Sequence, residues 1–237
     1  MQVKLTHYTY KMKPSHAVHY TVLPKNPEAH LFEVTCTVAQ PNPHGQTFSL
    51  PAWIPGSYLI REFARHIVTL QATCKGKPVK TTKLDKHTWH CSPCKGALEL
   101  KYEVYAWDLS VRGAHLDTTH AFFNGTSVFL MAHGLEDEAH AVEILPPSGK
   151  QYKEWRVATA MTRDGAREFG FGSYQAENYD ELIDHPVEMG DFDLVSFRAG
   201  GVPHHIAVTG VHDADRPVGR DAVEVGVVDD CDIAGLQ

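Results

Sequence analysis

Hydrophobic and polar residues alternate with a period of two along much of the first two thirds of the chain. The alternation is regular over residues 32–38, returns over residues 68–74, and is clearest over residues 98–106. In an extended strand this spacing places apolar side chains on one face and polar side chains on the other. The pattern predicts three half-buried β-strands, with Val68 opening the inward-facing set of the second.

Shorter apolar runs indicate further strands, separated by turns rich in Gly and Pro. They lie around residues 17–23, 127–131, 140–145, 154–158, 192–197 and 205–208. Many short strands joined by turns are typical of an antiparallel β-sandwich. A parallel α/β sheet would require amphipathic helices between its strands, and the hydrophobic pattern predicts none there. We therefore expect a mainly β protein built on an antiparallel β-sandwich.

The last part of the chain has a different organisation. Residues 179–185 predict a short helix that Pro186 ends, two strands follow, and residues 229–237 open like a second helix. About 65 residues with so few strands bury little core by themselves. We therefore divide the chain into a β-sandwich domain, residues 1–170, and a β-rich segment, residues 171–237, that must pack on something else.

Composition and charge argue against two classes of function. Hydrophobic residues at 43% and charged residues at 22% are typical of a soluble globular protein. A formal net charge of -7 without any basic block argues against partners such as nucleic acid or a membrane surface. We find no signal peptide and no run near the roughly 20 apolar residues of a spanning helix. Five cysteines, an odd number, fit reduced thiols, and we expect a cytoplasmic protein.

The abundance of histidine raises the question of a metal site. A catalytic zinc often takes its ligands from a His-Glu-x-x-His helix, and the sequence has no such motif. His133 and His140 flank Gly134 at a spacing that favours a charged loop. Cys91 and Cys94 form a single Cys-x-x-Cys without a second ligand pair, which favours two reduced cysteines in a hairpin over a zinc site. We therefore expect no metal ligands in this chain.

Motifs for nucleophilic catalysis and phosphate binding are also absent from the sequence. Neither a Gly-x-Ser-x-Gly elbow nor a Gly-rich phosphate-binding loop occurs. The segment from His115 to His120 contains Asp117 and permits two interpretations: a histidine oriented by a carboxylate, or a polar loop. By residue chemistry alone we expect no catalytic residue in this chain.

Two segments are unusual for a plain sandwich. Residues 50–67 combine prolines, aromatic residues and two arginines, which predicts an ordered corner. In the second segment, residues 117–130, the dipeptide Asn124-Gly125 favours positive φ and a tight turn. On residue types alone, a plain hairpin turn is the favoured interpretation of that dipeptide.

Three long runs of uncommon residue combinations stand out when the chain is taken as a whole. They are residues 51–65, which begin Pro51-Ala52-Trp53-Ile54-Pro55-Gly56-Ser57-Tyr58, then Phe122-Phe123-Asn124-Gly125-Thr126-Ser127, and finally residues 177–188. In content and order they resemble the glycyl aminopeptidase family of zinc metallopeptidases. The resemblance implies an N-terminal β-sandwich, a thermolysin-like catalytic domain and a C-terminal PDZ-type domain. It also implies a zinc-dependent hydrolase that releases N-terminal glycine or alanine from peptides.

The family that the chain resembles keeps its zinc ligands beyond the position that matches Gln237. The resemblance therefore implies that this chain is the N-terminal part only, and that residues 171–237 begin the catalytic domain. It implies zinc in the full-length protein, none in this chain, and no activity of the chain alone. A different class of function stays open, namely a free-standing β-sandwich that binds peptides or a partner protein.

The candidate substrate-binding residues form one turn, Phe123, Asn124, Gly125 and Thr126. In the full-length enzyme this turn would line the cleft and hold the N-terminal end of the peptide. The expected partners are therefore a peptide substrate and the catalytic and PDZ-type domains.

Overall fold

The computed structural model describes residues 16–54 and 58–210, together with the strand formed by residues 223–227. The predicted helix at residues 229–237 lies outside the described residues. The described chain is mainly β, as the alternating pattern predicts. Its largest element is an eight-stranded sheet in the order β14 (Thr162–Arg163), β15 (Gly172–Ala176), β12 (His140–Ile144), β1 (Val18–Asn26), β2 (Leu31–Val38), β8 (Leu98–Tyr105), β4 (Ile67–Cys74) and β5 (Lys77–Val79).

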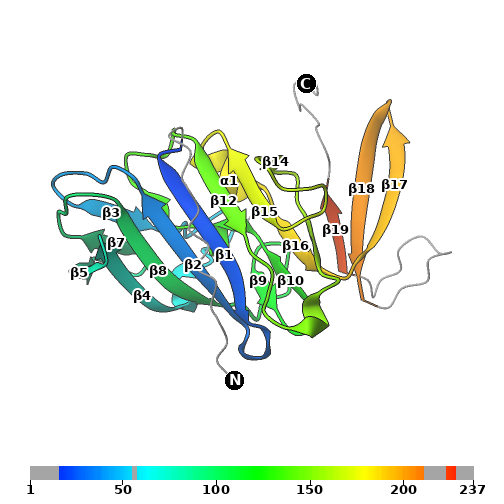
Figure 1. Cartoon of the computed structure of the whole chain (residues 1–237), viewed down its shortest axis with the longest axis horizontal. Helices are drawn as coiled ribbons and strands as arrows, with labels where there is room; N and C mark the ends of the chain where they lie inside the picture. The colour runs from blue at the N-terminus through cyan, green and yellow to red at the C-terminus, as the bar shows by residue number, and fades with distance from the viewer. Residues whose placement is uncertain (1–15, 55–57, 211–222, 228–237) are drawn as a thin grey trace.

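Two four-stranded sheets lie behind the large sheet in Figure 1 and form the second layer. One has the order β13 (Arg156–Ala158), β16 (Val187–Gly190), β10 (His120–Phe123) and β9 (Ala114–Leu116), and the other β11 (Met131–Ala132), β3 (Gln46–Ser49), β7 (Thr88–Cys91) and β6 (Thr81–Lys83). Core contacts join the layers: the rings of Phe32 and Phe123 lie 5.7 Å apart, and the buried Tyr20 hydroxyl donates to the Leu130 carbonyl over 2.7 Å. The inward-facing residues of the alternating strands fill the space between the layers, where apolar burial stabilises the fold.

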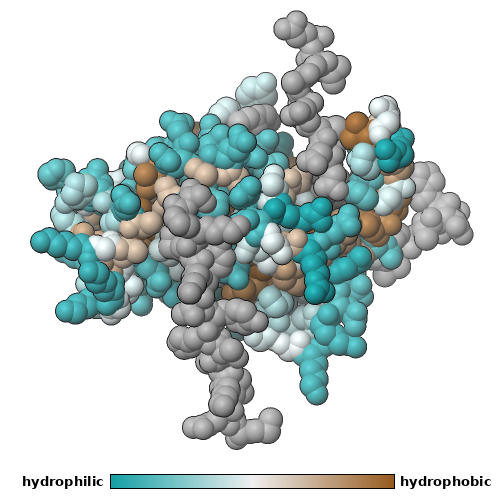
Figure 2. Space-filling model, turned by 45° about the horizontal axis from the view of Figure 1, so that its top comes forward, coloured by the Kyte–Doolittle hydropathy of each residue, from teal (hydrophilic) through white to brown (hydrophobic). Residues whose placement is uncertain are grey.

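A fourth sheet stands beside the two layers, at the right of Figure 1. It consists of β17 (Asp193–Ala199), β18 (Val202–Thr209) and β19 (Val223–Val227). A small apolar cluster that includes Phe122, Phe192 and Ala207 connects it to the four-stranded sheet of β10. Val195 and Phe197 of β17 are 50% and 46% exposed, and Figure 2 shows hydrophobic surface at this end of the molecule.

Helical segments are short throughout the described residues. They are η1 (Pro27–Ala29), η2 (Phe63–His66), η3 (Gly125–Ser127), η4 (Lys150–Tyr152) and α1 (Tyr179–Asp184). The predicted helix before Pro186 is confirmed as α1, which begins where the Asn178 side chain accepts a hydrogen bond from the Glu181 amide over 2.8 Å. None of the helices described here is long and apolar enough to cross a lipid bilayer.

Local sequence patterns fail at three points. The large sheet is not purely antiparallel, because β1 pairs with β12 in parallel. Val68 is not inward-facing but 58% exposed, because a β-bulge between Ile67 and Thr69 leaves it as the extra residue and gives Ile67 the place opposite Val104. The predicted strand at residues 127–131 is replaced by η3 and an irregular segment that leads to the two-residue β11.

The segment after residue 170 contributes to the sandwich before the three-stranded sheet of β17, β18 and β19 begins. β15 pairs with β12 in the large sheet, and β16 joins β13 to β10 in the smaller one. The predicted boundary between a β-sandwich domain, residues 1–170, and the start of a catalytic domain, residues 171–237, refers to the longer protein and stays a prediction.

Candidate functional site

The second and third unusual segments of the sequence meet in space at η3. Gly125 packs so closely on α1 that an added Cβ would lie 2.7 Å from the Ile183 Cα and 3.0 Å from the Leu182 carbonyl oxygen. Only glycine therefore allows η3 and α1 to approach this closely. The buried Tyr179 hydroxyl donates to the Phe129 carbonyl over 2.7 Å and fixes the same contact. The first segment joins this group because η2 contacts η3.

The turn of Phe123, Asn124, Gly125 and Thr126 differs from its predicted geometry. Asn124 has a φ of -86° and a ψ of 135°, and Gly125 is not in the left-handed region either. The prediction of positive φ is therefore wrong, because Asn124 is the N-cap of η3 and not the centre of a hairpin turn. Its Oδ1 accepts hydrogen bonds from the Thr126 amide at 3.1 Å and the Thr126 hydroxyl at 2.5 Å.

Burial limits what this turn can offer to a ligand. Phe123, Gly125 and Thr126 are buried, and Asn124 is half-buried. The Asn124 amide N–H donates to the Gly113 carbonyl over 2.9 Å, and its own carbonyl accepts from the Ser127 hydroxyl over 2.7 Å. Within the described residues the side-chain nitrogen Nδ2 of Asn124 makes no hydrogen bond, so it can donate one to a ligand.

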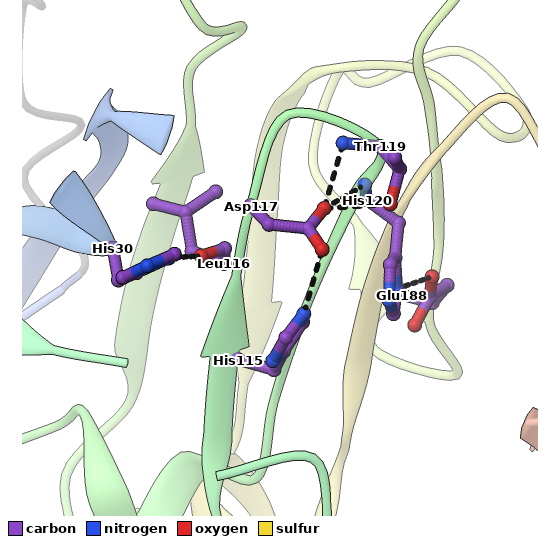
Figure 3. A network of polar contacts seen from close by, with 7 residues as sticks. All are labelled: His30, His115, Leu116, Asp117, Thr119, His120 and Glu188. Carbon is purple, nitrogen blue, oxygen red and sulfur yellow. Dashed lines mark hydrogen bonds and ion pairs between the residues drawn. The ribbon is translucent and has the colours of Figure 1, made fainter. Parts of the chain in front are cut away.

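A cluster of polar side chains lies at the opposite end of β10, where β9 turns into β10 (Figure 3). Asp117 shapes this turn, since its Oδ1 accepts from the Thr119 amide at 2.6 Å, the Thr119 hydroxyl at 2.6 Å and the His120 amide at 3.0 Å. The other oxygen, Oδ2, lies 3.2 Å from Nε2 of His115. The interpretation of this segment as a histidine oriented by a carboxylate is confirmed.

His120 is held from the neighbouring strand. In the register of β10 and β16, Gly190 lies opposite His120 and Glu188 lies two residues further on the same face. His120 Nδ1 and Glu188 Oε1 are 3.0 Å apart, and Glu188 is fully buried. An added Cβ on Gly190 would lie 3.1 Å from the His120 Cβ, so glycine makes room for this side chain.

Burial and pairing set the protonation of the cluster. Burial by itself would lower the pKa of His120, but the hydrogen bond and charge of Glu188 outweigh it and raise that pKa. Burial also raises the pKa of the Glu188 carboxyl and lowers that of His115. Partial burial opposes ionisation of Asp117, yet the hydrogen bonds from Thr119 and His120 hold its pKa well below the ordinary value.

His115, Asp117 and His120 each present one possible ligand atom, and these three atoms lie within 4.8 Å of one another. Among the described residues, this is the group of three or more such side chains that comes together. The sequence showed the three residues but gave no sign of Glu188, because its contact depends on strand register across 68 positions of the chain.

The other sequence candidates do not assemble into a site within the described part of the chain. His133 bonds to the Ser49 hydroxyl over 2.8 Å, whereas His140 faces the Glu138 carbonyl over 2.6 Å. Cys91 is buried in β7, and burial raises the pKa of its thiol. Cys94 is half-buried, and burial raises the pKa of its thiol to about 11, which disfavours the thiolate that metals bind.

Comparison with known proteins gives a family match over most of the chain. The family model described as the peptidase M61 N-terminal domain matches residues 19–191, which include all of the polar cluster. A solved structure of an aminopeptidase N family protein from Idiomarina loihiensis is 39% identical, with a TM-score of 0.80 over 84% of this chain. This chain covers 33% of that protein, so it spans about a third of its length.

More distant structures also match. The M1 zinc metallopeptidase from Deinococcus radiodurans is 12% identical over 86% of this chain and 49% of that chain, with a TM-score of 0.39. At that score the likeness supports no conclusion. No curated protein matches the chain.

Proposed function

Because the chain belongs to the peptidase M61 N-terminal domain family, we propose that it is the N-terminal region of a zinc-dependent aminopeptidase. The intact enzyme would release N-terminal glycine or alanine from peptides, as the resemblance to glycyl aminopeptidases implies. The observation that supports this best is the family match over residues 19–191, together with 39% identity to an aminopeptidase N family protein.

The chain's own residues do not fit the catalytic zinc of such an enzyme. The sequence contains no His-Glu-x-x-His motif, and the cluster at His115 is built on a β-hairpin and not on a helix. We therefore assign the catalytic zinc and the hydrolytic step to the rest of the parent protein. The chain would supply structure and one wall of the substrate cleft. We also propose a cytoplasmic location, supported by Cys36, Cys74, Cys91 and Cys94, which form no disulfide within the described part of the chain.

The exposed face of β17 fits a chain that continues into a larger protein. Val195 and Phe197 alternate with Ser196 on this strand, so the two half-exposed apolar side chains share one face. Large apolar side chains exposed side by side mark contact surfaces more often than free surface. We propose that the sheet of β17, β18 and β19 begins the thermolysin-like catalytic domain and that the rest of that domain covers this face. A C-terminal PDZ-type domain would follow it.

Activity of the longer protein tests this function. We expect the intact protein to hydrolyse glycyl and alanyl peptides faster than peptides with large N-terminal residues, and a chelator to abolish the activity. The 237-residue chain assayed alone should be inactive in both conditions. Peptide binding by the 237-residue chain itself, with no cleavage by a longer form, would instead favour the free-standing binding module.

The Asn124 turn is the part of this chain that we propose to contact the peptide. Its free Nδ2 donor suits a carbonyl oxygen near the peptide's N-terminal end. In the intact enzyme, Asn124→Ala should lower kcat/KM for glycyl and alanyl peptides by roughly 3- to 10-fold, the effect of one lost hydrogen bond.

A matched control separates this role from the loss of a helix cap. Asn26 caps η1 through the Ala29 amide at 3.2 Å, on the loop between β1 and β2. Asn26→Ala removes a similar cap and should leave kcat/KM unchanged. Equal kcat/KM for Asn124→Ala and wild type in an active enzyme would exclude the turn but not the aminopeptidase function.

A further inference from the structure

The hairpin of β9 and β10 brings two imidazoles and one carboxylate together in a half-buried position (Figure 3). We propose that His115, Asp117 and His120 bind one divalent transition-metal ion of the zinc type. This site uses residues of this chain alone, so it stands or falls independently of the aminopeptidase function.

The donor set and its spacing fit zinc. Two imidazole nitrogens and one carboxylate oxygen are a ligand set that zinc uses with a water in the fourth position. Two ligands about 2.0 Å from a tetrahedral zinc ion lie about 3.3 Å from each other. The 3.2 Å between His115 Nε2 and Asp117 Oδ2 already has this length. Mg²⁺ and Ca²⁺ prefer oxygen ligands, and the two histidines discriminate against them.

Two of the three ligands, His120 and Asp117, are oriented by further contacts. Glu188 engages Nδ1 of His120, so the other nitrogen of that ring, Nε2, is the one left for a metal. A carboxylate behind a metal-binding histidine fixes the ring and increases its basicity. Three donors hold Oδ1 of Asp117, and this leaves Oδ2 as the coordinating oxygen. The residues are thus arranged before any ion arrives, which reduces the entropy cost of binding.

Burial and access also suit a bound ion. His115 and His120 are 6% and 9% exposed, whereas the Asp117 side chain is 27% exposed and opens the cluster to solvent. The Trp107 ring stacks on His115 at 5.1 Å and covers one face of that imidazole. An ion that enters past Asp117 would keep a water on the open side and would pin the β9–β10 turn to β16 through His120 and Glu188.

Metal titration of the 237-residue chain tests the proposal. After treatment with a chelator, we expect calorimetry with Zn²⁺ to show one site per chain, and Mg²⁺ and Ca²⁺ to show none. Co²⁺ in place of Zn²⁺ should give visible d–d bands without the thiolate charge-transfer absorption that cysteine ligands produce. Asp117→Asn and Glu188→Gln should each weaken Zn²⁺ binding by about 10- to 100-fold.

Both variants are chosen so that weaker Zn²⁺ binding is not simply the result of misfolding. Asp117→Asn keeps an Oδ1 acceptor for the turn, and Glu188→Gln changes no ligand. The chain also offers a matched control, because His87 lies 3.8 Å from Asp85 in an exposed pair, and no third ligand joins this pair among the described residues. His87→Gln should leave Zn²⁺ affinity unchanged.

Three outcomes would overturn the site. One is a wild-type chain that binds Zn²⁺ no more tightly than its His115→Gln variant. Another is Zn²⁺ affinity that survives both Asp117→Asn and Glu188→Gln. The last is binding that is lost on Cys91→Ser with thiolate absorption in the Co²⁺ spectrum, which would place the metal at the cysteine pair.

Discussion

Two polar networks of this molecule both join side chains from neighbouring strands, but one is exposed to solvent and the other is buried. On the outer face of the large sheet, Lys25 contacts Glu33 and Glu103 at 2.8 Å each, and Lys101 contacts Glu33 at 2.6 Å. The lysine side chains there are 44% and 55% exposed. The cluster around His120 has contacts of similar length, yet Glu188 behind it is fully buried.

This difference in burial sets how much each network contributes to the free energy of unfolding. Water and salt screen the outer network, so its attraction is largely offset by solvation and side-chain entropy. In the buried network an unpaired charge is costly, so each group depends on its partner. The comparison indicates that contact distance alone says little about the energetic weight of a polar contact, and that burial decides it.

A third histidine, His140, is buried without a carboxylate partner within the described residues, and it gives the largest expected change in the free energy of unfolding. His140 is more buried than His120, and its Nε2 has no hydrogen-bond partner in the part of the chain that the structure describes. Burial lowers its pKa from 6.5 to about 4, and His19 on the adjacent strand shows the same shift. The unfolded chain therefore takes up protons first as the pH falls, and stability is lost between pH 6.5 and about 4.

We expect acidification across this window to cost up to about 3 kcal/mol for each of these two histidines. Urea unfolding at several pH values measures the loss. His140→Asn keeps a donor toward the Glu138 carbonyl without titrating, so its stability should fall less steeply with acid. Equal slopes for the variant and the wild type would contradict the prediction, as would an NMR pKa of His140 near 6.5.

Removing the partner of Glu188 should have the next largest effect. His120→Ala removes the hydrogen bond between His120 and the buried Glu188 carboxyl, and we expect a loss of about 3 kcal/mol in the free energy of unfolding. Denaturant unfolding in the presence of chelator measures it without any contribution from metal. Combining His120→Ala with Glu188→Gln should cost less than the sum of the two single changes, because the residues are coupled. Additive losses would show that the pair is not coupled.

Sequence patterns predict the parts of the fold whose causes are local. The strand over residues 98–106 and the helix that Asn178 caps and Pro186 ends are both found, since alternation, capping and proline act within a few residues. The prediction that Val68 faces inward is wrong because of a β-bulge. This bulge is defined only by the pairing of β4 with β8, so the sequence around Val68 does not reveal it. Periodicity counts residues in one strand and cannot show an insertion relative to its neighbour.

The candidate site follows the same division. His115, Asp117 and His120 lie within one six-residue segment, and the contact of a histidine with Asp117 is foreseeable from that spacing. Glu188 reaches the cluster only through the register of β10 and β16, which no short motif encodes. At Gly125 the sequence suggests a local cause, but the actual cause is a distant contact. Glycine is needed there because α1 approaches closely, and not because of the positive φ that the dipeptide suggests.

Changes in the exposed network of Lys25 should have the smallest effect on the free energy of unfolding. They also give the strictest test of whether burial distinguishes the two networks. Lys25→Met removes the contacts with Glu33 and Glu103 while keeping the apolar stem, and it should change the free energy of unfolding by less than about 1 kcal/mol. Added salt should reduce even that difference, because it screens exposed charges. Lys95→Met, at an exposed lysine, is the matched control for the loss of one positive charge. If Lys25→Met destabilised the chain as much as His120→Ala, burial would not be what distinguishes the two networks, and the shared geometry of the cross-strand pairs would have to explain both.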